Sequence, residues 1–260
     1  MPCKPLVAVP VYNEQSNVGT VLDAVRRQVR DILVVDDGST DDTPALLRAL
    51  DGAHVITHPE NRGYGASLAT AFRFAARRGY DWLITLDADG QHEADHIPEF
   101  LEAAALGDAD IISGTRYADG HDTPQARQTA PPERRRINRS ITALLNRELG
   151  LSLTDTFCGF KAYRVAVLSR FDITVPGYAM PIQLWVQAAR LGLRVREIPV
   201  QLRYLDPNRH FGGLLDDPVA RLKHYLEVYR AETGRALLSA TPIRTPAEPC
   251  SCCDGRDVSS

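Results

Sequence analysis

Two carboxylates separated by one residue are the strongest chemical signal in this chain. Asp87 and Asp89 follow an apolar run at residues 82–86 (WLITL). Side chains alternate direction along a strand, so both carboxylates are expected to leave the strand end on the same side. Like charges held this close are costly unless a cation lies between them, and Mg²⁺ and Mn²⁺ prefer such oxygen ligands. Asp87 and Asp89 are therefore candidate metal ligands, with the amide oxygen of Gln91 as a third. A solvated acidic turn is the alternative.

The first half of the chain alternates apolar runs with amphipathic segments. The runs expected to form strands are residues 6–10, 32–35, 54–57, 82–86 and 111–113. Helices are expected between them, at about residues 17–28, 41–50, 66–78 and 97–105. Nearly continuous apolar strands separated by such helices predict an α/β fold, with a mostly parallel sheet covered by helices on both faces. Ligands of such sheets bind beyond the carboxyl ends of the strands, and the polar clusters of this chain fall there.

Several of these clusters resemble the signature motifs of family 2 glycosyltransferases, which have the Rossmann-like GT-A fold. The motifs are residues 10–14 (PVYNE), 35–41 (VDDGSTD), 61–65 (NRGYG) and 87–92 (DADGQH). Residues 114–117 (GTRY) and 155–161 (DTFCGFK) resemble the dolichyl-phosphate mannose synthase-like branch of that family. The resemblance extends from about residue 6 to residue 213. It implies a metal-dependent enzyme that moves a hexose from a nucleotide sugar to an acceptor with inversion of configuration.

The resemblance also implies roles for individual residues. The residues that match the nucleotide-holding motifs are Pro10, Tyr12, Glu14, Asp36 and Asp37. Their chemistry fits, because an aromatic ring can stack on a base and a carboxylate can accept hydrogen bonds from a ribose. Asn61 and Gly65 lie where a loop enters a helix, and glycine there permits close backbone approach. By the same resemblance, Asp87, Asp89 and Gln91 hold a divalent cation, Mg²⁺ or Mn²⁺, and the sugar diphosphate.

Breaking a nucleotide-sugar bond leaves a diphosphate, so cationic side chains are expected near the site. The resemblance covers Arg116 directly, and Arg139 and Arg209 are further candidates for binding phosphate groups. Residues 134–136 (RRR) begin an amphipathic helix, where positive charge opposes the helix dipole and indicates a nearby anion. A solvated basic face is the alternative. The candidate catalytic residues are Asp89, Arg116 and Asp155.

One departure from the family pattern bears on the acceptor. In residues 177–183 (GYAMPIQ), Gln183 stands where the lipid-phosphate branch carries a glutamate. A glutamine cannot act as a general base, whereas a phosphate acceptor already presents an anionic oxygen and needs none. We therefore expect a polyprenyl phosphate acceptor; a sugar hydroxyl would need another base, for which Asp155 is the candidate. Residues 208–214 (NRHFGGL) lack the Ser-Lys element of the branch, so the donor, of the GDP-mannose or UDP-glucose type, stays open.

Composition limits the domain organisation and the location of the protein. A chain of 260 residues with 44% hydrophobic content can bury one core. We expect a catalytic domain at 1–213, a C-terminal surface helix packed on it at 214–238, and a disordered Cys-containing tail at 239–260. Because no apolar run approaches about 20 residues and no signal peptide is evident, we expect a cytoplasmic protein without a transmembrane span. The C-terminal helix has an apolar face that would suit peripheral contact with the cytoplasmic membrane face, or packing on the core.

Other classes of protein fit less well. A net charge of -3 gives no reason to expect a nucleic-acid partner. A dinucleotide-binding oxidoreductase would need a G-x-G-x-x-G loop after the first strand, where this chain has residues 12–14 (YNE). A nucleotidyltransferase would begin with a glycine-rich phosphate loop, which is also absent. A nucleotide-sugar-binding protein without transfer activity remains an alternative that only an assay can separate from an enzyme.

Overall fold

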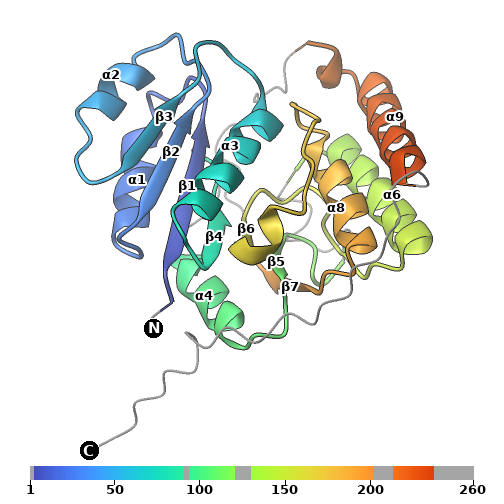
Figure 1. The fold of residues 1–260 in the computed structure, drawn as a ribbon. Helices are drawn as coiled ribbons and strands as arrows, with labels where there is room; N and C mark the ends of the chain where they lie inside the picture. The colour runs from blue at the N-terminus through green and yellow to red at the C-terminus, as the bar shows by residue number, and fades with distance from the viewer. Residues whose placement is uncertain (1–2, 91–93, 121–129, 202–212, 237–260) are drawn as a thin grey trace, which may run out of the picture.

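The computed structural model describes residues 3–90, 94–120, 130–201 and 213–236. Within these ranges the strands form one seven-stranded sheet in the order β3-β2-β1-β4-β6-β5-β7 (Figure 1). The strands are β1 (Pro5–Val11), β2 (Ile32–Asp36), β3 (His54–Thr57), β4 (Trp82–Thr85), β5 (Ile111–Thr115), β6 (Lys161–Arg164) and β7 (Val195–Pro199). All five strands expected in the first half of the chain are present, with ends shifted by one or two residues.

The sheet is parallel except for one strand. β6 is antiparallel to both of its neighbours, β4 and β5, whereas β5 and β7 are parallel. The expected mostly parallel sheet is therefore confirmed. β6 and β7 were not predicted, because both β6 (KAYR) and β7 (VREIP) mix charged and apolar residues.

Helices cover both faces of the sheet, as predicted. The helices are α1 (Val18–Arg26), α2 (Thr43–Arg48), α3 (Tyr64–Arg77), α4 (Ile97–Ala105), α6 (Pro132–Leu149), α7 (Val165–Leu168), α8 (Met180–Arg190) and α9 (Pro218–Ala236), with short 3₁₀ turns η1 (Ala94–His96) and η2 (Gly213–Asp216). Alternation along β1 divides the core: Leu6 and Ala8 pack with α3, α6 and α8, whereas Val7 and Val9 pack with α1 and α4. Each face of the sheet thus has its own apolar layer.

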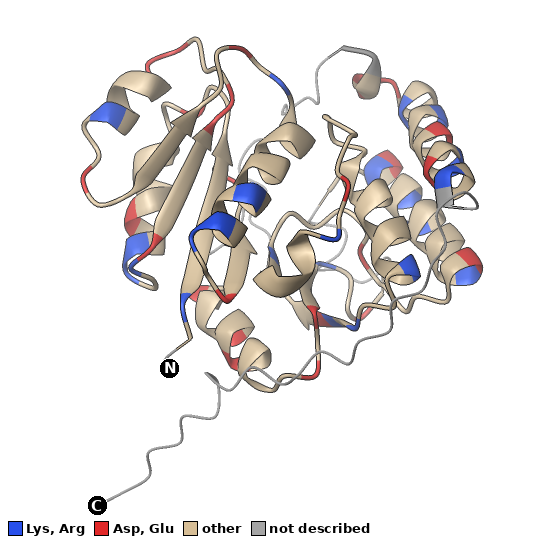
Figure 2. Ribbon diagram, in the orientation of Figure 1, with Lys and Arg blue, Asp and Glu red and all other residues tan. Residues whose placement is uncertain are grey.

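Strand register brings several loops to one edge of the sheet. Val11 pairs with Asp36, and Asp36 pairs with Thr57, so the loops after β1, β2 and β3 begin at the same level. The antiparallel β6 reaches that edge with its first residue, because Lys161 pairs with Thr85 at the end of β4. The loop before β6 therefore meets the loops after the parallel strands. Figure 2 shows that β1 to β4 are nearly without charge, while acidic segments follow some of their ends.

The last described helix, α9, packs against α8 and α6 at one end of the molecule (Figure 1). Tyr225 of α9 is buried and stacks on Phe157, with ring centroids 4.8 Å apart. Val219, six residues earlier in the same helix, is 76% exposed. Among the described helices, none is both long enough and apolar enough to cross a membrane. The predicted tail at 239–260 lies outside the described residues.

Candidate functional site

A pocket of about 410 Å³ opens at the carboxyl edge of the sheet. Most of the residues predicted for the site contribute to its wall. The predicted residues that line it are Pro10, Tyr12, Glu14, Asp37, Asn61, Asp87, Asp89 and Arg116. Pro10 lies near the end of β1, and the others come from the segments after β1, β2, β3, β4 and β5, so the strand register described above brings them together. These eight residues, which include aromatic, acidic and basic groups, are up to 106 positions apart in the sequence, from Pro10 to Arg116.

The loop after β1 is held against the loop after β2 by Asn13. Its backbone has a positive φ of 55°, a conformation that asparagine tolerates better than most residues. The Oδ1 of Asn13 accepts hydrogen bonds from the backbone N–H groups of Thr40 and Asp41, at 2.7 and 3.3 Å. The N–H of Asn13 donates to the hydroxyl of Ser39 at 2.9 Å. With Asn13 fixed in this way, its neighbours Tyr12 and Glu14 both line the pocket.

Asp37 is held by groups from the loop after β3. Its carboxylate accepts hydrogen bonds from the backbone N–H groups of Arg62 and Gly63, at 3.0 and 2.7 Å. A ring nitrogen of the buried His58 lies 2.6 Å from the same carboxylate, and the other ring nitrogen lies 3.0 Å from the hydroxyl of Thr70. Asp37 therefore connects two loops of the pocket and keeps a fixed orientation.

Asp87 and Asp89 both line the pocket, as the alternation of side chains predicted. The Asp87 carboxylate packs against the backbone of Gly159, where a Cβ atom would lie only 2.7 Å from Cγ of Asp87. A glycine is needed there because any side chain would occupy the space of the carboxylate. Burial raises the pKa of Tyr64 well above its ordinary value, and the charge of Asp87 adds to the shift. These contacts hold Asp87 in position from two sides.

A buried lysine lies close to these carboxylates. The Nζ of Lys161 donates to the backbone carbonyl of Cys158 and lies 5.5 Å from the ring centroid of Trp185. Burial lowers the pKa of Lys161, and nearby acidic groups, including Asp155 and Asp87, act in the opposite direction. The lysine thus supplies positive charge behind the acidic wall of the pocket.

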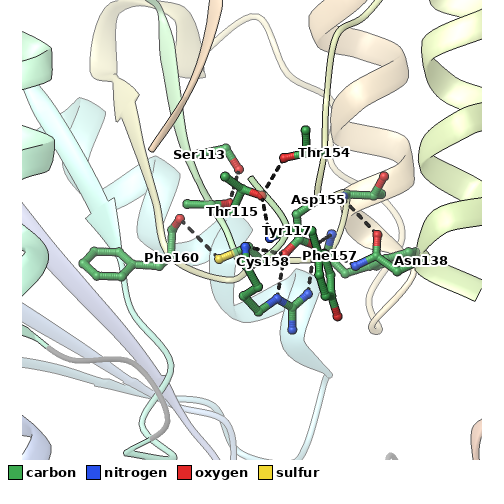
Figure 3. Close-up of polar contacts among 12 residues, drawn as sticks. Ser113, Thr115, Tyr117, Asn138, Thr154, Asp155, Phe157, Cys158 and Phe160 are labelled. Carbon is green, nitrogen blue, oxygen red and sulfur yellow. Dashed lines mark hydrogen bonds and ion pairs between the residues drawn. The ribbon is translucent and has the colours of Figure 1, made fainter. Parts of the chain in front are cut away.

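Arg116 lines the pocket and is oriented by Asp155. Its Nε lies 2.6 Å from Oδ2 of Asp155 and its Nη2 lies 2.8 Å from Oδ1, a bidentate pair. The carboxylate also accepts hydrogen bonds from the Asn138 side chain at 2.7 Å and from the Phe157 N–H at 3.1 Å. Figure 3 shows Asp155 beside Asn138, within the network that surrounds the 154–158 segment. Glu197 of β7 holds the same segment through the N–H groups of Thr154 and Asp155.

This environment bears on the role of Asp155 as a candidate base. Burial alone would raise its pKa, but the charge and hydrogen bonds of Arg116, with the Asn138 amide, hold the pKa well below its ordinary range. Asp155 is fully buried and does not contribute to the wall of the pocket. A carboxylate in that state is a poor proton acceptor, and the geometry favours a role in positioning Arg116 over the base that the sequence suggested.

Other predicted residues do not line the pocket. Asp36 is fully buried at the end of β2, where its Oδ1 accepts a hydrogen bond from the Ser39 N–H at 3.0 Å. Gly65, the second residue of α3, packs against residues 175–176: its N–H donates to the Pro176 carbonyl at 2.6 Å, and a Cβ there would collide with the Val175 carbonyl. Arg139 is exposed on α6 outside the pocket. Gln91 and Arg209 lie outside the described residues.

Gln183 is also outside the pocket, which corrects the expectation that it would face the acceptor. It is fully buried on α8, and its Oε1 accepts hydrogen bonds from the N–H groups of Thr174 and Val175, both at 2.9 Å. Its Nε2 donates to the carboxylate of Glu232 on α9 at 2.7 Å. Gln183 therefore connects α8 to α9 and to the 174–175 segment. Its identity says nothing direct about acceptor chemistry.

Some residues of the pocket were not singled out from the sequence. Asn138 is one of them: it lies on α6 one helical turn after Arg134, which belongs to the basic run predicted at residues 134–136, and both residues line the pocket. Asn138 sits within the apolar stripe formed by Ile137, Ile141 and Leu145, and a polar residue at such a position is a signal for a buried hydrogen bond. Arg221, on the buried face of α9 one turn before Tyr225, gives a similar signal.

Comparison with known proteins identifies the family. Residues 6–171 match the family model described as Glycosyl transferase family 2. The chain belongs to this family. This family 2 glycosyltransferase is similar to an undecaprenyl-phosphate mannosyltransferase of Micrococcus luteus. The two chains are 32% identical over a region that covers 90% of this chain and 98% of the relative. It is 34% identical, over 75% of its length and 76% of the relative's, to a polyprenol monophosphomannose synthase of Mycolicibacterium smegmatis.

The fold of this family 2 glycosyltransferase is also found among solved structures. Mannosyl-3-phosphoglycerate synthase from Rubrobacter xylanophilus superposes with a TM-score of 0.66 at 16% identity, covering 95% of this chain and 79% of that one. S. aureus TarS 1-349 in complex with UDP-GlcNAc gives a TM-score of 0.57 at 17% identity, covering 90% and 66%. The GT-A fold predicted from the motifs is therefore confirmed, and the lipid-phosphate relatives agree with the branch that the motifs resemble.

Proposed function

We propose that this glycosyltransferase moves a hexose from a nucleotide sugar to a polyprenyl phosphate, with inversion at the anomeric carbon. The observation that supports this most is the composition of the pocket at the carboxyl edge of the sheet. Its wall from the loops after β1 to β4 is aromatic and acidic, with Tyr12, Asp37 and Asp89. Its wall from later segments combines arginines with aromatic rings. The wall formed by the loops after β1 to β4, called here the donor half, suits a nucleotide with a metal-bound diphosphate. The wall formed by later segments, called here the acceptor half, suits a phosphate attached to an apolar chain.

The donor half fits a nucleoside diphosphate. Tyr12 is 44% exposed at the mouth of the pocket, so its ring is available to stack on a base. Asp37 is oriented by His58 and the 62–63 backbone, and a fixed carboxylate is suited to accepting ribose hydroxyl hydrogens.

The residues present fit a divalent cation. Asp87 and Asp89 line the same pocket, and the absence of a side chain at Gly159 leaves room for the Asp87 carboxylate. Two carboxylates are the usual protein contribution to a Mg²⁺ or Mn²⁺ site, where substrate phosphates and water complete the coordination. Such a cation would stabilise the negative charge that develops on the leaving diphosphate. Gln91, the third predicted ligand, lies outside the described residues.

The acceptor half fits an anionic group with an apolar tail. Arg116, Arg134 and Arg221 line it, together with apolar and aromatic side chains from several elements. The apolar and aromatic members are Ile137, Phe157, Tyr178, Pro181 and Tyr225. A polyprenyl phosphate presents its charge at one end and isoprene units immediately behind it. The names of both relatives described above include a polyprenyl phosphate or a polyprenol. This similarity favours a polyprenyl phosphate as the acceptor of this chain.

The proposed reaction is a single displacement. An oxygen of the acceptor phosphate forms a bond to the anomeric carbon as the bond from that carbon to the diphosphate breaks, and the nucleoside diphosphate leaves. A phosphate monoester is largely dianionic near neutral pH, since its second pKa is about 6. No protein base is then required, which agrees with the poor basicity of Asp155. The chain's contribution is to orient both substrates and to stabilise the leaving group through nearby cations.

Transfer of radiolabelled hexose tests this proposal. Purified protein is incubated with GDP-mannose or UDP-glucose, Mn²⁺ or Mg²⁺, and vesicles containing undecaprenyl phosphate, and product is measured in the organic phase. We expect organic-extractable label that EDTA abolishes, and at least a hundredfold loss in Asp89→Asn. The matched control is Glu102→Gln, an exposed carboxylate of α4 outside the pocket. Label found only in a water-soluble acceptor would refute the lipid assignment, and EDTA-resistant transfer would refute the metal assignment.

A lipid acceptor also implies work at a membrane surface. We propose peripheral contact, because the phosphate must enter a pocket whose mouth carries Tyr12 and Tyr178, both partly exposed. Sedimentation with vesicles tests it: binding should increase with undecaprenyl phosphate content. Equal sedimentation with and without the lipid phosphate would contradict contact through the acceptor.

A further inference from the structure

Ser67 is a buried polar residue of the pocket, two positions beyond the 61–65 motif. It lies on α3, is 1% exposed and lines the pocket. Its hydroxyl oxygen is buried and has no hydrogen-bond partner among the residues that the structure describes. A buried hydroxyl without a partner is destabilising, and native structures keep few of them. Where such a group belongs to the wall of a pocket, a ligand can complete the hydrogen bond.

The helix itself does not satisfy this hydroxyl. A serine inside a helix can donate to the carbonyl four residues earlier, which here is that of Gly63. That carbonyl accepts the backbone N–H of Ser67 at 3.1 Å, but no hydrogen bond joins it to the Ser67 hydroxyl. Thr70 differs: its hydroxyl lies 3.0 Å from a ring nitrogen of His58 and accepts a hydrogen bond from Arg73 at 3.0 Å. Of these two buried hydroxyls, the one without a described partner is the one that lines the pocket.

The position of Ser67 on α3 places it in the donor half. Residues three apart share a helix face, so Ser67 lies on the side of Thr70 and therefore toward His58. Gly65 is about 200° away around the helix axis, and a Cβ atom there would meet Met180 of α8. α3 packs against β1, β2 and β4 as well as against α8 (Figure 1). Ser67 thus faces the loops that hold the donor, and not α8.

Gly63 connects Ser67 to Asp37. Its carbonyl accepts the N–H of Ser67, and its own N–H donates to Oδ2 of Asp37 at 2.7 Å. Oδ1 of Asp37 already meets the Arg62 N–H and the ring of His58. A carboxylate oxygen accepts about two hydrogen bonds, so the described contacts leave Oδ2 with room for a ligand donor. The Ser67 hydroxyl can donate as well as accept, and the two side chains together suit a ligand that carries a donor next to an acceptor.

We propose that the hydroxyl of Ser67 binds the nucleoside part of the donor, on the same side of the pocket as Asp37. The inference rests on the proposed function for the class of donor. Two parts of a nucleoside have the required chemistry: a ribose hydroxyl, which donates and accepts, and the edge of a guanine or uracil base, where N–H groups lie beside carbonyl oxygens. The inference makes Ser67 a substrate contact, rather than a residue that only packs α3 on the sheet.

Nucleotide titration of the full chain tests this contact without turnover. GDP and UDP are titrated calorimetrically, in the presence of Mg²⁺, into the natural chain and into Ser67→Ala. We expect the affinity for the tighter-binding nucleotide to fall about fivefold, which corresponds to about 1 kcal/mol. Ser140→Ala is the matched control, because it removes an exposed hydroxyl of α6 outside the pocket and should bind like the natural chain.

Melting temperatures separate a substrate contact from a structural one. Because the Ser67 hydroxyl has no described protein partner, Ser67→Ala without ligand should melt at or above the temperature of the natural chain. The rise in melting temperature caused by the nucleotide should be smaller in this variant. Thr70→Val loses the contacts with His58 and Arg73, and should melt lower without ligand. A Ser67→Ala protein that melts lower and binds nucleotide normally would overturn the inference in favour of a structural role.

Deoxynucleotides identify the group that Ser67 contacts. If the partner is a ribose hydroxyl, the 2′-deoxy or the 3′-deoxy form of the nucleotide should bind the natural chain more weakly, with no further loss in Ser67→Ala. If the partner is the edge of the base, the effects of the deoxynucleotide and of the substitution should add. Either pattern supports the contact and assigns its partner.

The outcomes separate this inference from the proposed function. Weaker nucleotide binding in Ser67→Ala supports the contact even if no hexose transfer is found. Unchanged GDP and UDP affinity in Ser67→Ala, with binding by the natural chain, would overturn the inference and leave the proposed function intact. Binding of neither nucleotide by the natural chain would overturn both.

Discussion

Asp155 and Arg116 form a bidentate ion pair in which only the arginine reaches the pocket. The carboxylate is fully buried, and its remaining contacts with Asn138 and the Phe157 N–H fix its orientation. The buried carboxylate of Asp155 therefore fixes the orientation of the Arg116 guanidinium in the pocket. This relationship explains why a residue that the sequence suggested as a base is better understood as a support for Arg116.

Replacing Asp155 should reduce both activity and stability. Asp155→Asn leaves the Arg116 charge in the interior without its carboxylate, and removing one partner of a buried pair costs about 3 to 5 kcal/mol. We expect a lower free energy of unfolding of that order and at least a tenfold lower kcat. Chemical denaturation and steady-state kinetics measure the two effects. Asp119→Asn, at an exposed position, is the control and should change neither. Unchanged kcat in a folded Asp155→Asn protein would contradict the positioning role.

The same pair predicts a pH dependence of stability. The pKa of Asp155 is lower in the folded chain than in the unfolded chain, so the unfolded chain binds more protons as the pH falls. The stabilisation is fully present above the unfolded pKa of about 4 and is lost below it as the pH falls towards the folded value. Denaturation between pH 6 and pH 2 should show the natural chain and Asp155→Asn converging on acidification. A constant difference in unfolding free energy across that range would contradict this assignment.

Gln183→Glu should destabilise the protein without changing the choice of acceptor. The new carboxylate would face Glu232, whose oxygen lies 2.7 Å from the present amide nitrogen, in a fully buried setting. We expect a loss of about 3 kcal/mol in unfolding free energy, from two buried like charges. The double variant Gln183→Glu with Glu232→Gln restores one carboxylate and one amide, and should recover most of the loss. A stable single variant with altered acceptor preference would instead favour a direct role at the acceptor site.

A methyl group at residue 159 should impair the acidic part of the pocket. In Gly159→Ala the new Cβ would overlap the Asp87 carboxylate, with Cγ of Asp87 only 2.7 Å away, and would displace it. We expect at least a tenfold fall in turnover and a higher Mn²⁺ concentration for half-maximal activity. Gly234→Ala is the control, because a Cβ there meets nothing within 4 Å. Normal metal dependence in Gly159→Ala would argue against Asp87 as a ligand.

Tyr12 should contribute to nucleotide binding through its ring. Stacking of an aromatic side chain on a base contributes about 1 to 3 kcal/mol, and each 1.4 kcal/mol is a tenfold change in Kd. Tyr12→Ala should therefore weaken GDP or UDP binding by about tenfold or more, whereas Tyr12→Phe should stay within about threefold. Melting temperatures should not change, because Tyr12 is 44% exposed. Equal effects of the two substitutions would indicate that the hydroxyl, and not the ring, makes the contact.

Local patterns along the sequence determined the central strands and the loops that follow them. The apolar runs that became β1, β2, β4 and β5 are almost entirely buried, and their nearly continuous apolar sequences predicted them. The run that became β3 is largely exposed, because β3 is an edge strand of the sheet. Because parallel strands share a carboxyl edge, the positions of Tyr12, Asp37 and Asp89 at one pocket followed from the order of the runs. Asp87 and Asp89 both line this pocket, although β4 ends at Thr85 and Asp89 lies in a turn beyond it.

The tertiary structure decided which polar residues face substrate and which support their neighbours. Asp155 and Gln183 are polar residues in or beside motifs, yet contacts with Arg116 and with Glu232, the latter 49 residues away, remove both from the pocket. Arg221 shows the reverse case. An arginine in an amphipathic helix is ordinarily expected to face solvent, but α9 packs on α6 and α8 and Arg221 is buried. The spacing of apolar residues predicts which face of a helix or strand is buried. Which element covers that face depends on contacts between residues far apart in the chain. For that reason the sequence determined the fold and the loops of the site, and only the packing of α6, α8 and α9 decided the acceptor side.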